Sequence, residues 1–309
     1  MMKNIDLVII GGGPAGMAAA ISAYNSGIKK ILLLERDQFL GGILNQCIHT
    51  GFGLDYFKEI LTGPEYAERF IEKTRKITEI EVSLQSFAVS ITPDRTVTYI
   101  KPGKLVSVKA KSVVLATGCR EKTREMVHIP GSRPAGIFTA GFVQKLINIE
   151  GLLPGKNVVI VGSGDIGLIM ARRLVLEGVT VKAVIEIQKS SRGLQRNIVQ
   201  CIEDFNIPLY FNHKIKKVYG KNRVEKIEIV KVDDNLSEIQ NSGFFIECDT
   251  VLMSVGLIPE TELLEQNGSK MQFPWLFVCG NASKVYDMVD SVTKDSEIAG
   301  KSAAEYINQ

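Results

Sequence analysis

The sequence predicts an α/β fold, and three observations carry that prediction. Two glycine motifs of the form GxGxxG occur in the chain, at Gly11–Gly16 and Gly162–Gly167. Each motif directly follows a run of four apolar residues, as expected of a buried parallel strand. A glutamate stands 24 residues after the first glycine of each motif, at the end of a second apolar run: Glu35 and Glu186. The repeated pattern is typical of two Rossmann-like dinucleotide-binding domains, each of three layers.

The spacing of the glycines gives each motif a physical role. The first glycine permits a tight turn between strand and helix, and the second lets the backbone approach a pyrophosphate at the positive end of the helix. The third lets helix and strand pack closely, and the distant carboxylate binds ribose hydroxyls. Either motif alone is open to another interpretation, a tight turn that binds nothing. The strand, helix and acid around each motif argue against it.

Length and composition limit the class of protein. The 309 residues are enough for about two domains, and 45% hydrophobic with 23% charged residues is ordinary for a globular protein. A net charge of +3 gives no electrostatic reason to expect a nucleic acid or an anionic membrane as partner. We expect no membrane span, because no apolar run is long enough. The first strand begins within a few residues of the N-terminus, so we expect no signal peptide and a cytoplasmic location.

The cysteines predict free thiols in a reducing compartment. No CxxC occurs, and no spacing suits zinc or an iron–sulfur cluster, so no metal site is expected. The five cysteines are Cys47, Cys119, Cys201, Cys248 and Cys279.

The first half of the chain predicts its elements in order. Residues 5–35 predict a strand, a helix over roughly 13–26 and a second strand. A glycine-rich connection follows, and Pro64 with Glu65 suits the first turn of a helix. The glycine-rich connection covers residues 36–55, and the helix that begins with Pro64 covers 64–76. Strands follow within 79–110, around a turn at Pro102-Gly103. A buried strand at 112–115 then leads into Ala116-Thr117-Gly118.

The second half repeats the pattern after a loop that contains Pro130-Gly131 and Pro134. The second glycine motif implies a second strand–helix–strand unit, and residues 248–256 resemble the earlier segment 112–118. The other predicted elements are a helix near 139–149, strands near 207–212, 224–232 and 243–247, a strand-to-turn segment at 275–281 and a helix near 294–307.

In these motifs the chain resembles the pyridine nucleotide–disulfide oxidoreductase superfamily, in its short, thioredoxin-reductase-like branch. The resemblance covers essentially the whole length. It implies that FAD takes the first motif, that a nicotinamide cofactor takes the second, and that the nicotinamide domain is inserted into the FAD domain. The implied boundaries are 1–118 with 250–309, and 119–249. The resemblance rests on Gly11–Gly16 with Glu35, Ala116–Gly118, Gly162–Gly167 with Glu186, Ser254–Pro259 and Phe277–Asn281.

The motifs and the resemblance together assign the candidate cofactor-binding residues. Asn281 stands where the family usually has Asp, and its amide can still hydrogen-bond to the ribityl chain of a flavin. The candidates are Gly11, Gly13, Pro14, Ala15, Gly16, Glu35, Arg36, Gly42, Asn45, Ala116, Thr117, Gly118, Gly162, Gly164, Asp165, Ile166, Gly167, Glu186, Gly256, Gly280, Asn281, Ser291 and Val292.

Two departures from the family pattern bear on the reaction. Residues 136–142, where the thioredoxin-reductase-like branch carries its CxxC, contain no cysteine. The larger branch of the superfamily carries its cysteine pair after Gly41-Gly42, and those places hold Leu44 and His49. A disulfide reductase needs two thiols within bonding distance near the flavin. We therefore expect no direct reduction of a disulfide.

Other segments narrow the resemblance. Residues 41–49, Gly51-Phe52-Gly53, 62–66 and 116–121 resemble the flavoprotein subunits of anaerobic glycerol-3-phosphate dehydrogenases and of related sarcosine-oxidase-like and opine-type dehydrogenases. The resemblance implies an electron-transfer subunit whose partner dehydrogenase subunit carries the substrate chemistry, accompanied by a small cysteine-containing electron-transfer protein. Whether two copies of the chain form a homodimer stays open.

The predicted function is that of an FAD-dependent NAD(P)H oxidoreductase, which passes electrons between NAD(H) and FAD and on to a partner. Glu186 favours NAD(H) over NADP(H), because a carboxylate at that strand end binds a ribose 2′-OH and repels a 2′-phosphate. Two alternatives stay open. Cys47 lies in the loop expected near the flavin. If Cys47 is a redox thiol, the chain is a self-contained NADH oxidase or peroxidase; if it is only a small packed residue, it has no such role. The other alternative is a non-catalytic FAD-binding scaffold subunit.

Overall fold

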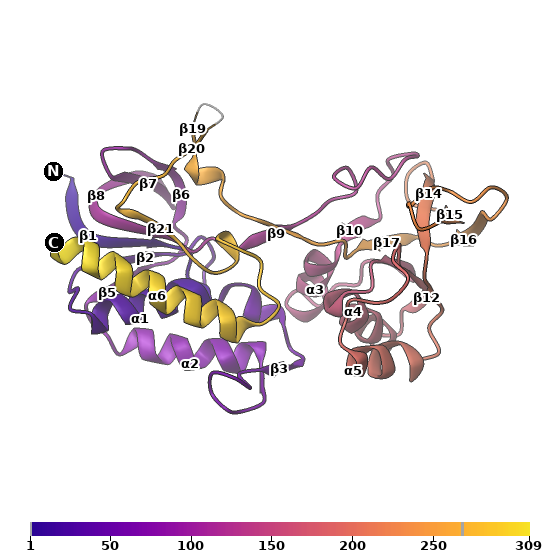
Figure 1. The fold of residues 1–309 in the computed structure, drawn as a ribbon, viewed down its shortest axis with the longest axis horizontal. Helices are drawn as coiled ribbons and strands as arrows, with labels where there is room; N and C mark the ends of the chain where they lie inside the picture. Colours follow the sequence, from indigo (N-terminus) through magenta and orange to yellow (C-terminus); the bar gives the residue numbers. More distant parts are fainter. Residues whose placement is uncertain (1, 267–268) are drawn as a thin grey trace. The chain divides into compact units, whose positions relative to one another are not determined.

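The computed structural model describes residues 2–266 and 269–309, which form two compact units (Figure 1). Unit 1 holds the residues up to Arg120 and those from Ile258 to Gln309, and unit 2 holds Glu121–Leu257. The chain therefore leaves unit 1, builds unit 2 and returns. The two connecting segments are the strands β9 (Cys119–Glu121) and β18 (Leu257–Pro259), which pair with each other.

One large sheet organises unit 1. Its strand order is β5-β2-β1-β8-β7-β6, with β21 also paired to β8. Pairing is parallel among β1, β2, β5, β8 and β21, and antiparallel among β6, β7 and β8. The strands are β1 (Lys3–Ile10), β2 (Ile31–Leu34), β5 (Ile80–Ser83), β6 (Phe87–Ile91), β7 (Thr96–Lys101), β8 (Lys104–Leu115) and β21 (Leu276–Val278).

The structure confirms the turn at Pro102-Gly103, which joins β7 to β8. It corrects the separate strand expected at 112–115, because that segment is the end of the long strand β8. Both parts of β8 find partners, the first part in β7 and the second in β1 and β21, so nothing interrupts the strand.

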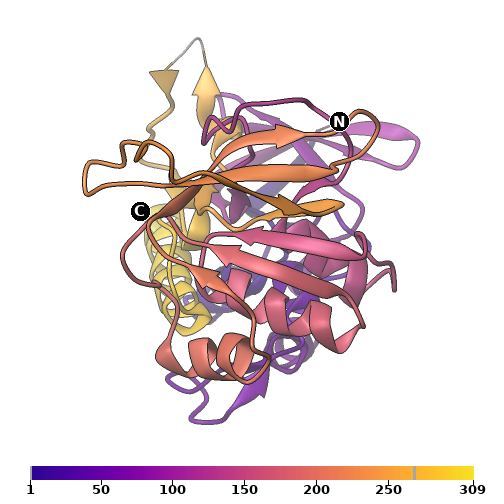
Figure 2. The same ribbon diagram turned by 90° about the vertical axis from the view of Figure 1, so that its right-hand side faces the viewer.

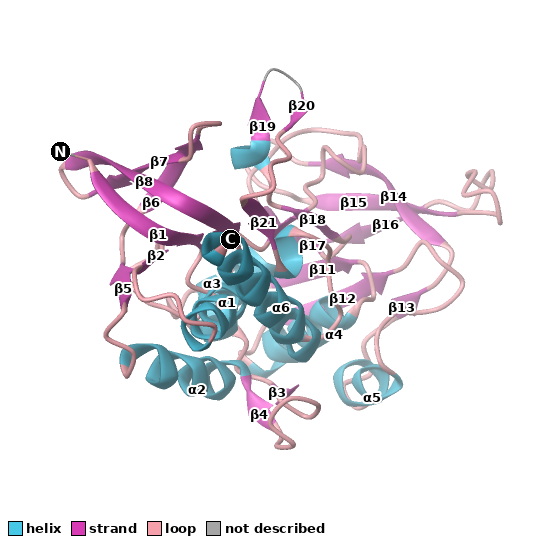
Figure 3. Ribbon diagram, turned by 60° about the vertical axis from the view of Figure 1, so that its left-hand side comes forward, coloured by secondary structure: helices cyan, strands magenta, loops and turns pink. Residues whose placement is uncertain are grey.

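Three helices cover one face of this sheet: α1 (Pro14–Asn25), α2 (Gly63–Arg75) and α6 (Val289–Asn308) (Figure 3). A second apolar core lies on the other face, against β6 and β7, which gives three layers. The helices α1 and α6 approach so closely that a Cβ on Gly300 would lie 2.2 Å from the carbonyl oxygen of Ala19. The helix α2 starts with a capping box between Thr62 and Glu65.

The helix α6 begins at Val289, earlier than the expected start near 294. Its first turn carries the buried Asp290, whose Oδ1 accepts a hydrogen bond of 2.9 Å from the backbone N–H of Tyr56. A buried acid breaks the apolar periodicity that marks a helix in a sequence, which explains the missed turn. The short elements of unit 1 are β3 (Thr50–Phe52), β4 (Leu61–Thr62), β19 (Glu265–Gln266), β20 (Ser269–Lys270) and the 3-10 turns η1 (Gly42–Gln46), η3 (Glu262–Leu264) and η4 (Gly280–Ala282).

Unit 2 repeats the parallel sheet with different covering layers (Figure 2). Its helical face is packed by α3 (Ala140–Asn148), α4 (Asp165–Leu176) and the π-helical turn η2 (Val199–Glu203), which follows the short helix α5 (Gln195–Ile198). Its other face packs against a three-stranded antiparallel sheet, β14 (His213–Tyr219), β15 (Lys226–Lys231) and β16 (Phe244–Glu247). The parallel sheet has the order β10 (Ile137–Thr139), β17 (Thr250–Met253), β11 (Asn157–Val161), β12 (Thr180–Ile185) and β13 (Leu209–Tyr210).

The predicted α/β class, with two parallel sheets, is confirmed. The strand β14 was not predicted, because its residues 213–219 carry three lysines and show little alternation of apolar side chains. The strand β13 is shorter than the expected segment 207–212.

Candidate functional site

The two glycine turns share one hydrogen-bond frame. The N–H of Gly11 donates to the carbonyl of Leu34 and that of Gly162 donates to the carbonyl of Ile185, both at 2.8 Å. On the other side of each turn, the residue that follows the neighbouring strand makes an equivalent bond. After β8, Ala116 N–H donates to the carbonyl of Ile10 (2.8 Å), and after β17, Ser254 N–H donates to the carbonyl of Val161 (2.7 Å). Each turn is therefore held between three parallel strands at their carboxyl ends, where open α/β sheets bind ligands.

The first and third glycines of each motif are required by packing. A Cβ on Gly11 (φ +113°) would lie 2.3 Å from the carbonyl oxygen of Ala116, and one on Gly162 (φ +97°) would lie 2.0 Å from that of Ser254. A Cβ on Gly16 would lie 1.8 Å from the carbonyl oxygen of Gly11, and one on Gly167 would lie 2.4 Å from that of Gly162. No side chain fits at these four positions.

The second glycines behave differently. Gly13 is the N-cap of α1 (φ −75°, ψ −173°) and Gly164 is the N-cap of α4 (φ −69°, ψ 167°), conformations that any residue can adopt. A Cβ on Gly13 would meet nothing closer than the Cα of Gly42 at 3.9 Å, and one on Gly164 would meet nothing within 4 Å. Neither helix has a side-chain cap, so first-turn N–H groups remain available to an anion. The space beside each second glycine suits a pyrophosphate.

The two glutamates occupy equivalent places. Glu35 Oε2 accepts from Gly12 N–H (2.7 Å) and its Oε1 accepts from Asp37 N–H (2.8 Å). Glu186 Oε2 accepts from Ser163 N–H (2.9 Å) and its Oε1 accepts from Gln188 N–H (2.9 Å). Both are buried, and burial raises the pKa of Glu35, although its two backbone hydrogen bonds act in the opposite direction. Both oxygens of Glu35 and Oε1 of Glu186 keep a second lone pair with which to accept from a ribose hydroxyl.

Of the candidate residues next to the glycine turns, some are buried in the packing of a helix and others are exposed. Pro14 and Ala15 are buried in the first turn of α1, and Arg36 is exposed beyond β2. Asp165 Oδ1 accepts from Leu194 N–H (2.8 Å) and from Asn197 Nδ2 (2.6 Å), which ties α4 to the loop after β12. Ile166 is partly buried against the helical core of unit 2.

The loop after β2 lies beside the first turn. Gly41 N–H donates to the carbonyl of Gly12 (2.9 Å), and a Cβ on Gly42 would lie 3.1 Å from the Cα of Gly13. Asn45 Nδ2 donates to the carbonyl of Leu40 (2.9 Å), so this side chain shapes the loop. The equivalent loop in unit 2 makes the same contact, from Gly193 N–H to the carbonyl of Ser163 (3.2 Å).

Cys47 is buried in this loop. Its side chain is 6% exposed and its Sγ donates to the carbonyl of Ile43 (3.3 Å). Burial raises the pKa of Cys47 to about 12, whereas a nucleophilic thiol needs a lowered pKa. These observations favour the packing role over the redox role for Cys47. None of the five cysteines forms a disulfide within the part of the chain that the structure describes.

The remaining candidates lie at strand ends and near the start of α6. Thr117 Oγ1 donates to the carbonyl of Glu260 (2.6 Å), next to Ala116 and Gly118. Gly256 (φ +107°) holds the same position after β17 in unit 2. Gly280 (φ +59°) donates from its N–H to Asp295 Oδ2 (2.7 Å), and its Cβ position lies 2.8 Å from the Cβ of Ala15. Asn281 Oδ1 accepts from Tyr286 N–H (3.0 Å), and Ser291 and Val292 lie in the first turn of α6.

Some residues of the two turns were not predicted. Gly12 and Ser163 bind the glutamates, and the hydroxyl of Ser163 adds a hydrogen bond to Glu186 Oε2 (2.7 Å). Their position, second in each motif, was the available signal. The carboxylate of Asp295 accepts a hydrogen bond from Gly280, 15 residues earlier in the sequence, and no local sequence pattern predicts this contact.

The described residues offer neither a metal site nor a membrane span. No group of three or more His, Cys, Asp or Glu side chains among them is arranged to hold a metal ion. No helix in that part of the chain is both long and apolar enough to cross a bilayer.

The family model for pyridine nucleotide-disulphide oxidoreductases matches residues 5–274. The chain is 28% identical over 290 residues to the HcnB subunit of hydrogen cyanide synthase from Pseudomonas protegens, covering 87% of this chain and 60% of the relative. It is 27% identical over 290 residues to an opine oxidase subunit from Agrobacterium tumefaciens (87% and 55%) and 27% identical over 266 residues to NADH dehydrogenase of Bacillus subtilis (85% and 48%).

The chain spans roughly half to three-fifths of the length of these relatives. Among solved structures, thioredoxin reductase of T. acidophilum aligns with a TM-score of 0.74 at 21% identity, covering 98% of each chain. At that identity the likeness concerns the fold.

Proposed function

Because this chain belongs to the pyridine nucleotide-disulphide oxidoreductase family, we propose that it is an FAD-dependent oxidoreductase that transfers hydride between NAD(H) and FAD and passes electrons to a partner. One observation carries the proposal. The same hydrogen-bond frame occurs twice, and each copy leaves open space beside one glycine at a helix N-terminus, Gly13 and Gly164. Two such sites in one chain suit electron transfer between two dinucleotides.

Unit 1 is the proposed FAD unit and unit 2 the proposed NAD unit, in the order that the family resemblance implies. The first-turn N–H groups of α1 and α4 would bind the two pyrophosphates, and Glu35 and Glu186 would bind ribose hydroxyls. Gly280 and Asn281 would position the flavin. When bound, FAD supplies the two-electron redox chemistry, which no side chain can provide. We propose NAD(H) over NADP(H), because the buried carboxylate of Glu186 would repel a 2′-phosphate.

The arrangement of thiols supports a partner as the route for electrons. The pKa values of Cys47, Cys248 and Cys279 are each raised by burial to about 12, so none is poised to react as a thiolate. This observation weighs against the oxidase or peroxidase alternative through Cys47. It also agrees with the expectation that the chain does not reduce disulfides directly.

The partner that we propose is a separate dehydrogenase subunit, with a small electron-transfer protein beside it. Two of the relatives are named as subunits, one of hydrogen cyanide synthase and one of opine oxidase. The resemblance to flavoprotein subunits of glycerol-3-phosphate dehydrogenases makes glycerol 3-phosphate the first substrate to test. It rests on residues 41–49, 51–53, 62–66 and 116–121.

The segment 53–60 of unit 1 is the proposed coupling surface. Leu54 and Ile60 are 46% and 68% exposed there, although both are apolar. The segment is anchored to α6 by the ion pair Asp55–Lys294 and by the bond from Tyr56 to Asp290, so it presents a fixed surface. Lys58 is exposed at its tip, whereas Glu65 caps α2 and is unsuitable as a surface probe.

Anaerobic titration with NADH tests the core of the proposal. The isolated chain should contain one FAD, lose its flavin absorbance on addition of NADH, and reduce an artificial dye without oxidising glycerol 3-phosphate. A flavin that NADH cannot reduce would support the scaffold alternative. Addition of the dehydrogenase subunit should couple the two half-reactions.

A pair of charge reversals tests the coupling surface. Lys58→Glu should slow coupled turnover and leave dye reduction unchanged, whereas Lys76→Glu, an equal charge change on an exposed residue at the end of α2, should affect neither. Rapid turnover with oxygen or peroxide that disappears in Cys47→Ser would show that the oxidase alternative is correct.

A further inference from the structure

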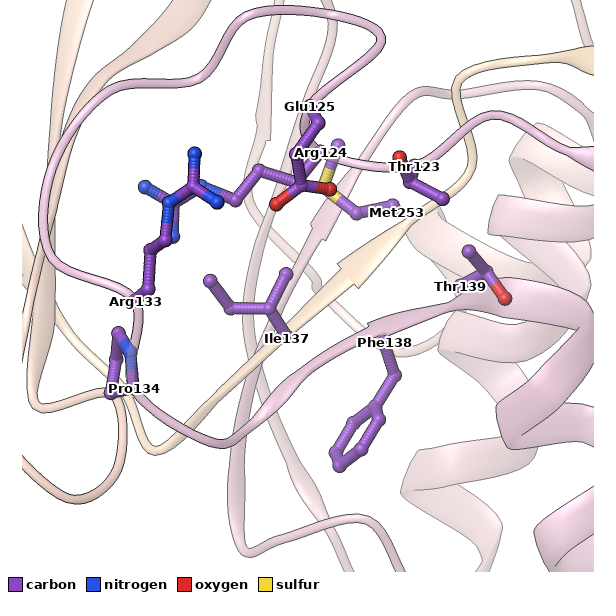
Figure 4. Close-up of a pocket in the computed structure, with 9 residues that line it drawn as sticks. All are labelled: Thr123, Arg124, Glu125, Arg133, Pro134, Ile137, Phe138, Thr139 and Met253. Atoms are coloured by element: carbon purple, nitrogen blue, oxygen red, sulfur yellow. The ribbon is translucent and has the colours of Figure 1, made fainter.

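Unit 2 contains a cavity that the dinucleotide turns do not explain (Figure 4). Its volume is about 270 Å³. Ile137 and Phe138 of β10 and Met253 of β17 form an apolar wall, and the segment 123–134 closes the other side with Arg124, Glu125 and Arg133. All of these residues belong to unit 2, so the cavity is complete within one unit.

The position of the cavity separates it from the second glycine turn. None of the described residues that line it belongs to Gly162–Gly167. Ile137 and Met253 pack in the core on the face covered by β14 and β15, whereas Phe138 packs on the opposite, helical face, where α4 also lies. The cavity is therefore distinct from the glycine turn in its residues, and the charges of its lining indicate which ligand it suits.

Arg124 makes the cavity unusual. The residue is 7% exposed, and its guanidinium donates from Nε to the carbonyl of Ile129 (2.9 Å) and from Nη1 to the carbonyl of Ser132 (2.7 Å). Both acceptors are neutral, and no carboxylate of the described residues forms an ion pair with Arg124. Burial lowers the pKa of Arg124, Glu125 opposes that shift and Arg133 adds to it. A buried cation whose direct hydrogen-bond partners are both neutral is costly, and an anionic ligand would relieve that cost.

The other charged residues leave the cavity with an excess of positive charge. Arg133 is exposed and points to the same end of the cavity as Arg124 (Figure 4). Glu125 is the single carboxylate among the described residues of the lining, and hydrogen bonds from its own N–H and from the Thr123 side chain hold its pKa low. Two guanidinium groups against one carboxylate, with an apolar wall beside them, favour a ligand that is anionic at one end and apolar at the other.

We infer that this cavity binds a small organic anion, a carboxylate or a phosphate monoester on a compact apolar body. The charged group would accept hydrogen bonds from Arg124 and Arg133, whose planar donors suit both anions. The apolar body would contact Ile137, Phe138 and Met253. The site is independent of the electron-transfer function proposed above and does not require it.

Calorimetric titration of the full chain with three probes of one shape tests the inference. Benzoate and phenyl phosphate carry the two candidate anions, and benzamide is their neutral counterpart. At least one anion should bind about tenfold more tightly than benzamide, and the better of the two identifies the anion. Equal binding of benzamide, or no binding of either anion, would overturn the inference. Binding must also persist in saturating NADH, because competition would assign the cavity to the nicotinamide cofactor.

Three variants locate the bound anion. Arg133→Gln removes one exposed charge without touching the contacts that hold Arg124, and it should weaken anion binding about tenfold. Thr123→Trp keeps the charges and fills the cavity from an exposed position, and it should abolish binding. Lys145→Gln makes an equal charge change on an exposed residue of α3 that does not line the cavity, and it should bind like the unaltered chain. Unchanged affinity in the first two variants would place the anion elsewhere and refute the assignment.

Discussion

Glu35 and Glu186 close the two glycine turns with the same pair of hydrogen bonds, one to the second residue of the turn and one to the residue two positions beyond the glutamate itself. The two sites differ at the second residue of the turn, because Ser163 adds a hydroxyl donor to Glu186 where Gly12 has no side chain. Glu186 is thus held by three donors and Glu35 by two. The second carboxylate has correspondingly less freedom to turn away from a ligand.

The open space beside Gly13 and Gly164 predicts that FAD binding and reduction by NADH can be lost separately. Gly13→Val should yield a folded chain whose affinity for FAD is weakened at least about tenfold, because the branched side chain occupies space that no protein atom fills. Gly164→Val should keep its flavin and lose reduction by NADH. Flavin content, NADH titration and the melting temperature of both variants check this, and each variant is the control for the other. A Gly13→Val chain that retains a full complement of flavin would contradict the assignment.

The carboxylate of Glu186 predicts the choice of nicotinamide cofactor. The unaltered chain should prefer NADH, and Glu186→Gln should narrow the ratio of kcat/KM values for NADH and NADPH about tenfold, since it removes the negative charge beside the 2′ position. Dye reduction measures the ratio. Ser163→Ala removes the hydroxyl hydrogen bond and retains the charge, so it should leave the preference in place. A preference for NADPH in the unaltered chain would contradict the prediction.

Buried thiols predict a loss of stability at alkaline pH. The pKa of Cys47 is raised from 9.0 to about 12, so the unfolded state releases this proton before the folded state does. The free energy of unfolding should therefore fall as pH rises above about 9, by up to about 1.4 kcal/mol per pH unit for this thiol. Denaturant unfolding at several alkaline pH values checks the slope, and Cys47→Ala should make it shallower by that amount. Identical slopes would show that Cys47 ionises as readily in the folded chain as in the unfolded chain.

The crossing of α1 and α6 predicts a strong effect of one methyl group. Gly300→Ala gains about 1 kcal/mol of helix propensity, but its Cβ would lie 2.2 Å from a backbone carbonyl, which cannot move aside cheaply. The clash should win, with a net destabilisation of about 1–3 kcal/mol. Lys301→Ala, at the next, exposed position of α6, should change the unfolding free energy little. A stabilised Gly300→Ala chain would mean that the helices separate more easily than their packing indicates.

The local patterns of the sequence predicted the two glycine turns well, because strand, glycine spacing and helix are all local features. The open space at Gly13 and Gly164 agrees with the role inferred for the second glycine. Contacts between distant segments were not predictable. Asp290, for example, is buried and accepts a hydrogen bond from the backbone of Tyr56, which is 234 positions away in the sequence. The cavity of unit 2 combines residues 123–139 with Met253, and no local pattern connects them.

The insertion of unit 2 imposes an order on biosynthesis. Residues 1–120 leave the ribosome first, but α1 cannot complete its packing until α6 supplies Gly300, some 280 residues later. All of unit 2 emerges in the interval and can finish folding by itself, since none of its strands comes from outside 121–257 except the connecting pair. We therefore expect one face of α1 to stay uncovered until α6 has been synthesised. A nascent chain halted before residue 289 should hold a native unit 2 and an incomplete unit 1 that recruits chaperones.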